Sequence, residues 1–218
     1  MPIFECSRCN EMTYSAFPGA VATPCPSCEG EYCRVLDGNF DDARRCGRNL
    51  AAGDHATLAY EDPSTVAPFC ARYLTEGVNA GERVIAPLRD EMREGIASML
   101  AADVELLVEW EDAEQIYGDF DADRIASMYD ALIGGEERTT RVLAQLDDGL
   151  AGGVPPAELD RYEVAAHSII TSHGALAICL YDAGSLDPAV LEIGARRHTL
   201  AIEDGAIRRN ERFEYQAA

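Results

Sequence analysis

The 218-residue sequence contains no lysine, and all 18 of its basic residues are arginine. A Walker A phosphate loop, a protein kinase and a Schiff-base enzyme each need a lysine amine, so these three classes are excluded. The sequence also lacks G-x-S-x-G, H-E-x-x-H and G-x-G-x-x-G, the patterns of serine hydrolases, zinc proteases and dinucleotide-binding folds. We therefore expect a protein that is not an enzyme.

Long apolar runs are also missing. No stretch approaches the roughly 18 apolar residues of a membrane-spanning helix. The chain start, from Met1 to Cys6, has neither the basic nor the apolar region of a secretory signal. We predict a cytoplasmic protein without membrane contact.

Positive charge is scarce, because 39 acidic residues face 18 arginines and give a formal net charge of −21. The first fifty residues hold seven acids and five arginines, so nearly all of the excess lies in the remainder of the chain. A surface this acidic repels the phosphates of nucleic acid. We therefore expect no nucleic-acid binding, except through the N-terminal region, which carries little net charge.

Four of the eight cysteines, Cys6, Cys9, Cys25 and Cys28, form two C-x2-C pairs with fifteen residues between them. Two such pairs can supply the four thiolates of a closed tetrahedral site, so residues 1–35 are predicted to form a zinc ribbon with one structural zinc ion. Iron at the same four thiolates, or redox-active thiol pairs, are the alternatives. A zinc deaminase shares the P-C-x-x-C half of this pattern but needs an earlier H-x-E, and the first histidine is His55.

The other four cysteines are not assigned to the ribbon. Cys33 and Cys46 are too few for a closed site and are predicted to be free thiols. A reducible pair, or a second site together with His55, are the alternatives. Cys70 and Cys179 lie in apolar patterns, where a buried cysteine behaves as a small apolar side chain. Both are predicted to belong to the core.

Beyond a polar connector at residues 36–53, strand and helix patterns alternate. This order predicts an α/β domain with a mostly parallel sheet and helices on both faces. Predicted strands cover 56–60, 83–87, 104–110, 140–146 and 175–181. Predicted helices begin near Asp62 or Ala67, then cover 88–100, 121–133, 155–173 and 187–197, and a hairpin follows over 199–209.

Ligands of such sheets bind at the carboxyl ends of the strands. Tyr60, Tyr181 and Asp182 stand there and are candidates to line a pocket, the alternative being packing aromatics and a turn carboxylate. His55 begins the first strand, and His198 is either a helix cap or a pocket member. These five residues are the candidate ligand-binding set.

Other polar residues are given structural roles. His167 and His173 lie six apart on one predicted helix and so do not share a face, which makes both poor metal ligands. The acidic pairs at 136–137 and 147–148 are predicted to be solvated surface rather than catalytic carboxylates.

Several short stretches together match the pattern of a known family in their order and spacing. They are 55–60, 67–69, 76–77, 80–84, 160–163, 179–182 and 197–198, followed by Asp204-Gly205 and Asn210. On these stretches, residues 54–215 resemble the MEDS domain, a sensory domain of methanogen and methylotroph proteins and of a dichloromethane-responsive repressor. The resemblance implies a degenerate relative of the RecA and KaiC ATPases that senses hydrocarbon derivatives. Two positions depart from the family's pattern, Leu180 in place of a frequent Gln and Thr199 in place of Pro.

The segment where a relative would carry its phosphate loop, residues 60–65, has no glycine and no lysine but two carboxylates. We therefore expect a regulatory sensor that binds a small apolar molecule, with the zinc ribbon as its module for contacting a regulatory protein partner. A transcription-associated adaptor, with the ribbon docking protein or nucleic acid, is the alternative. A residual nucleotide hydrolase is disfavoured, and a homodimer stays open.

Overall fold

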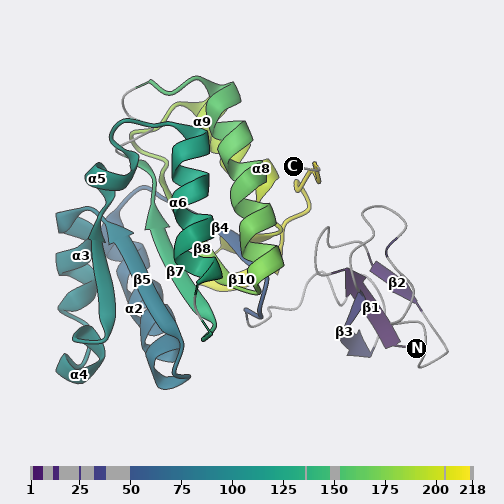
Figure 1. Ribbon diagram of the computed structural model, residues 1–218, viewed down its shortest axis with the longest axis horizontal. Helices are drawn as coiled ribbons and strands as arrows, with labels where there is room; N and C mark the ends of the chain where they lie inside the picture. Colours follow the sequence, from purple (N-terminus) through teal and green to yellow (C-terminus); the bar gives the residue numbers. More distant parts are fainter. Residues whose placement is uncertain are drawn as a thin grey trace.

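A computed structural model describes residues 2–6, 12–14, 25, 32–37, 50–135, 137–147, 153–203 and 205–216. Its main body is a seven-stranded sheet in the order β10-β9-β4-β8-β7-β5-β6 (Figure 1). Only the β9–β10 pair is antiparallel among the described strands of this sheet. The predicted mostly parallel sheet is confirmed. The strands are β4 (His55–Tyr60), β5 (Arg83–Leu88), β6 (Val108–Asp112), β7 (Thr140–Gln145), β8 (Leu176–Asp182), β9 (Leu200–Glu203) and β10 (Ala206–Arg209).

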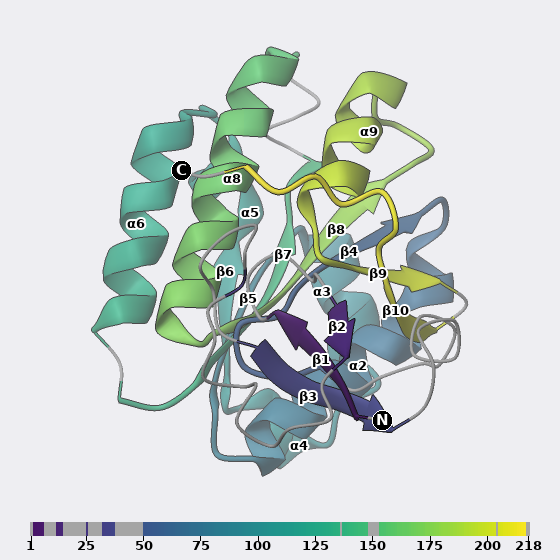
Figure 2. The same cartoon turned by 90° about the vertical axis from the view of Figure 1, so that its right-hand side faces the viewer.

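Helices cover both faces of the sheet, and α6, α8 and α9 lie on the same face (Figure 2). Side chains alternate along each strand, so Ile178 and Leu180 of β8 face α2 and α3, whereas Cys179 and Tyr181 face α6, α8 and α9. The helices are α2 (Pro63–Asn79), α3 (Asp90–Ala97), α4 (Ala102–Glu105), α5 (Ala113–Tyr117), α6 (Ala122–Gly134), α8 (Pro156–His173) and α9 (Pro188–Arg197).

Aspartate caps begin four of these helices. In the first turn of α2, α5, α6 and α9, a backbone N–H donates to the side chain of Asp62, Asp112, Asp121 and Asp187, respectively. Each cap satisfies a donor that the helix itself leaves open. The first helix therefore begins beside Asp62 rather than near Ala67, and Pro68 lies within it.

The predicted strand over 104–110 is wrong at its start. The chain forms the short helix α4 there, and β6 begins only at Val108. Leu106 and Leu107 are 85% and 65% exposed, while Val104 and Val108 are buried. A run of apolar residues does not reveal which of them face the core.

The N-terminal region forms a separate antiparallel sheet in the order β2-β1-β3, built from β1 (Pro2–Cys6), β2 (Met12–Tyr14) and β3 (Tyr32–Asp37). Cys6 and Cys25 are buried there with Phe4, and Tyr215 packs against them. Cys9 and Cys28 lie outside the described residues, as does Cys46. The zinc ribbon therefore stays a prediction. In the part of the chain that the structure describes, no helix is both long and apolar enough to span a membrane.

Candidate functional site

Four buried side chains from four elements meet beneath α8 and α9. His55 begins β4, Glu163 lies on α8, Cys179 lies on β8, and His198 follows α9. His55 Nε2 lies 3.4 Å from Cys179 Sγ and 3.9 Å from Glu163 Oε2, and His198 Nε2 lies 3.5 Å from the same oxygen. One donor atom from each residue falls within 4.8 Å of all the others. We call these four residues the buried cluster.

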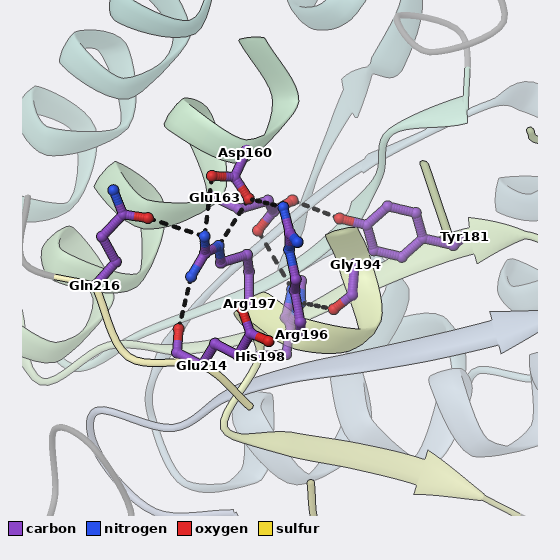
Figure 3. Close-up of polar contacts among 9 residues, drawn as sticks. All are labelled: Asp160, Glu163, Tyr181, Gly194, Arg196, Arg197, His198, Glu214 and Gln216. Atoms are coloured by element: carbon purple, nitrogen blue, oxygen red, sulfur yellow. Dashed lines mark hydrogen bonds and ion pairs between the residues drawn. The ribbon is translucent and has the colours of Figure 1, made fainter. Parts of the chain in front are cut away.

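Neighbouring groups orient the buried cluster (Figure 3). The Tyr181 hydroxyl donates a hydrogen bond to Glu163 Oε1. His198 Nδ1 lies 2.7 Å from the Gly194 carbonyl, so Nδ1 carries the proton and the Nε2 lone pair faces Glu163. The rings of His55 and His198 are in contact, with their centroids 4.0 Å apart.

Burial disfavours charge on every member of the buried cluster. It raises the pKa of Glu163 to about 7, against the opposing hydrogen bond from Tyr181. It lowers the pKa of His198 to about 3 and that of His55 well below its usual value. Burial, and secondarily the charge of Glu163, raise the pKa of the Cys179 thiol.

A bidentate ion pair joins the two helices that carry Glu163 and His198. Arg197 of α9 donates from Nε to Asp160 Oδ1 at 2.8 Å and from its Nη2 to Oδ2 at 3.0 Å. Arg197 also donates to the Glu214 carbonyl and to Gln216 (Figure 3). The arginine thereby fixes α9 to α8 and to the C-terminal segment.

A second polar group occupies the carboxyl edge of the sheet. The Tyr60 hydroxyl donates to Asp147 Oδ2 at 2.6 Å, and Gln145 Nε2 donates to the same oxygen at 2.9 Å. The Asp182 backbone N–H donates to Asp147 Oδ1 at 2.9 Å. Asp147 is 1% exposed, so its predicted place on the solvated surface is wrong, because three donors satisfy it inside the sheet edge. Burial raises its pKa.

Changing Tyr60→Phe should destabilise the domain by about 1–3 kcal/mol, because Asp147 loses a buried donor while its carboxyl remains. Chemical denaturation measured by circular dichroism checks this. A loss below about 0.5 kcal/mol would show that Asp147 does not depend on the phenol.

A pocket of about 230 Å³ lies between α9 and the strands beneath it. We call it the α9 pocket. Tyr181 forms part of its wall, and the same side chain reaches Glu163 in the buried cluster. The other lining residues are Thr57, Ala59, Leu191, Ala195, Ala201, Ile202, Glu203, Asn210 and Arg212.

The five candidate ligand-binding residues thus divide between two places. His55, Tyr181 and His198 meet at the buried cluster, whereas Tyr60 and Asp182 share Asp147 at the sheet edge. Successive residues of a strand face opposite sides of the sheet, so Tyr181 and Asp182 of β8 belong to different groups. Their role in ligand binding stays a prediction.

Sequence reasoning missed two members of the buried cluster. Glu163 lies in the matching stretch 160–163 but was not chosen as a site residue, and Cys179 was predicted as plain core although it lies beside His55. His167 stacks on His55 with a centroid distance of 5.9 Å but supplies no atom to the cluster. His173 instead pairs with Asp130 on α6 at 2.8 Å.

Residues 54–199 match the model of a family described as the methanogen/methylotroph, DcmR sensory domain, abbreviated MEDS. The chain belongs to the MEDS family. All four residues of the buried cluster lie inside the matched MEDS segment. The N-terminal sheet lies outside it.

Three solved structures are similar to this chain. The flagellar accessory protein FlaH from Methanocaldococcus jannaschii matches with a TM-score of 0.54 and 15% identity, over 83% of this chain and 89% of FlaH. A KaiC-like protein from Pyrococcus horikoshii OT3 matches with a TM-score of 0.49, 14% identity and coverages of 77% and 83%. The RadB recombinase matches with a TM-score of 0.49 and 13% identity, over 69% of this chain and 74% of RadB. The FlaH match shows the fold alone. No curated protein matches the sequence.

Proposed function

We propose that the protein is a non-enzymatic sensor whose MEDS domain binds a small, largely apolar molecule in the α9 pocket. The observation that carries the proposal is the pocket itself, which opens beside the buried cluster and shares Tyr181 with it. At about 230 Å³ it is smaller than the roughly 300–1,000 Å³ of pockets for drug-sized ligands. A short hydrocarbon derivative fits this size.

The lining supports a mainly apolar ligand with one polar group. The walls from α9 and β9 include Leu191, Ala195 and Ile202, while Asn210 and Arg212 bring polar atoms. Such a surface buries an apolar body and orients it through a few hydrogen bonds.

The C-terminal segment connects the α9 pocket to the N-terminal region. Asn210 and Arg212 line the pocket, the Glu214 carbonyl accepts from Arg197, and Tyr215 packs against Phe4 and the two buried cysteines near it. A ligand that shifts this segment would change the surface of the N-terminal sheet. We propose this sheet, with the predicted zinc ribbon, as the module that contacts a regulatory protein partner.

The turn after β4 supports a role without nucleotide chemistry. A phosphate bound to a fold of this kind would sit at the N-terminus of the following helix. Here the Asp62 carboxylate accepts from Ser64 N at 2.8 Å and occupies that end of α2. A carboxylate at this place repels phosphate and takes up the backbone donor that would bind it.

Filling the α9 pocket should weaken ligand binding. We expect dichloromethane or a short-chain alcohol, titrated into the ¹⁵N-labelled protein, to shift amide signals of residues along β4, β9 and α9. Ala195→Leu adds bulk to the pocket wall and should weaken this binding at least about tenfold, which corresponds to about 1.4 kcal/mol.

Ala189→Leu is the matched control, because Ala189 lies on the same helix but is exposed. It should bind as the wild type does. Equal binding by the wild type and Ala195→Leu, or no saturable shift with any compound of the series, would contradict the proposed function.

A further inference from the structure

The buried cluster has the donor set and the spacing of a transition-metal site. With Zn–N bonds of about 2.0–2.1 Å and Zn–S bonds of about 2.3 Å, tetrahedral ligands stand about 3.3–3.7 Å apart. Two of the measured separations, 3.4 Å from His55 Nε2 to Cys179 Sγ and 3.5 Å from His198 Nε2 to Glu163 Oε2, lie in this range. The 3.9 Å from His55 Nε2 to Glu163 Oε2 lies just above it.

Two of these atoms are buried without a hydrogen bond among the described residues. Glu163 Oε2 and His198 Nε2 have no such partner, and both residues are fully buried. A buried polar atom left in this state destabilises the fold. A cation between them would coordinate both atoms.

Neighbouring groups orient two of these side chains through hydrogen bonds, as is usual for the ligands of a metal ion. The Gly194 carbonyl at 2.7 Å takes the Nδ1 proton of His198 and leaves Nε2 free to coordinate. The Tyr181 hydroxyl occupies Glu163 Oε1 and leaves Oε2 directed at the two histidines. His55 Nδ1 is the exception, since it has no hydrogen-bond partner among the described residues.

The ligand types select the metal. Two imidazoles, one thiolate and one carboxylate suit zinc or a late first-row ion and do not suit magnesium or calcium, which bind oxygen ligands. Four protein ligands leave no open position in a tetrahedral shell, which is typical of a structural zinc site. We propose that His55, Glu163, Cys179 and His198 bind one zinc ion that ties α8 and α9 to β4 and β8.

This proposal does not depend on the α9 pocket binding a ligand, nor on the predicted zinc ribbon. The competing arrangement is a metal-free network in which a protonated Glu163 faces His198 and the Cys179 thiol contacts His55. The test below separates the two.

Zinc content per chain, measured by plasma mass spectrometry on the full-length protein, should fall by about one equivalent in Cys179→Ser and in His198→Gln. Cys70→Ser is the matched control, because Cys70 is equally buried but packs on the opposite face of the sheet. Its zinc content should equal that of the wild type. Equal zinc content in all four proteins would overturn the proposal.

Zinc K-edge X-ray absorption on the wild type keeps the test decisive if the two variants fail to fold. A zinc ribbon alone gives sulfur scattering only, whereas the buried cluster adds nitrogen scattering with the outer-shell signature of imidazole. Imidazole scattering supports the proposal. A spectrum of sulfur ligands alone, or a protein without zinc, overturns it.

Discussion

Replacing Asp160 by asparagine is expected to destabilise the MEDS domain by about 3 kcal/mol. The change leaves the Arg197 guanidinium, whose side chain is 8% exposed, without the carboxylate that binds it at two points. Removing one partner of a buried pair costs about 3–5 kcal/mol, and the 21% exposure of Asp160 places this pair at the low end. Chemical denaturation of the full chain measures the difference.

Asp123→Asn is the control for this change, because Asp123 is 78% exposed and lies 3.4 Å from Arg161. An exposed pair contributes at most about 1 kcal/mol. Equal losses in the two variants would contradict the role given to Asp160.

The effect of Asp160→Asn should also depend on pH. Hydrogen bonds from Arg197 and Arg196 hold the pKa of Asp160 below its usual 3.8. A lowered carboxyl pKa contributes stability that is fully present above the unfolded value and is lost as the pH falls through the folded value. The gap between wild type and variant should therefore be constant near pH 7 and narrow below about pH 4.

Tyr181→Phe is expected to be the second strongly destabilising change, lowering the free energy of unfolding by about 3 kcal/mol. The phenol donates to Glu163 Oε1, and Oε2 has no hydrogen bond among the described residues. Without the phenol, Oε1 of the fully buried Glu163 loses its hydrogen-bond donor. An unsatisfied buried polar group costs about 1–3 kcal/mol, and more when it is charged.

Tyr73→Phe is the matched control for this loss. Tyr73 is also buried, but its hydroxyl contacts the carbonyls of Val142 and Leu176 at the longer distances of 3.2 and 3.3 Å. We expect a loss of about 1 kcal/mol. If Tyr181→Phe is no more destabilising than this control, Glu163 does not depend on the phenol.

Much of the fold follows from local patterns in the sequence. Helical patterns predicted α2, α6 and α9, with the start of α2 left open between Asp62 and Ala67, and the alternation of elements predicted the parallel sheet. The error at β6 came from an apolar run in which Leu106 and Leu107 proved exposed. Periodicity over so few residues does not separate the last turn of a helix from the first residues of a strand.

The site was less predictable, because its parts are far apart in the chain. Cys179 and His55 meet through the register of β4 against β8, where His55 lies opposite Ala177. Glu163 reaches them only because α8 crosses the same face of the sheet. Such contacts depend on tertiary packing. The sequence therefore indicated individual residues, such as His55 and His198, but not which residues they contact.

The proposed sensor function rests on the α9 pocket, and the buried cluster lies beside the same helix. The cluster and the Asp160–Arg197 pair fix the inner side of α9, while the pocket lies along the same helix. A ligand there meets Tyr181 on one wall and the C-terminal segment on the other. We propose that α9 is held in place on this side and that a bound ligand displaces the C-terminal segment.

The most direct test of this account is the location of a bound probe. Alanine methyl groups labelled with ¹³C allow contacts between dichloromethane and individual side chains to be measured by nuclear Overhauser spectroscopy. The account predicts contacts to the methyl groups of Ala59, Ala195 and Ala201, which line the α9 pocket. Saturable binding with contacts only to alanines outside this pocket, or no binding by any compound of the series, would contradict it.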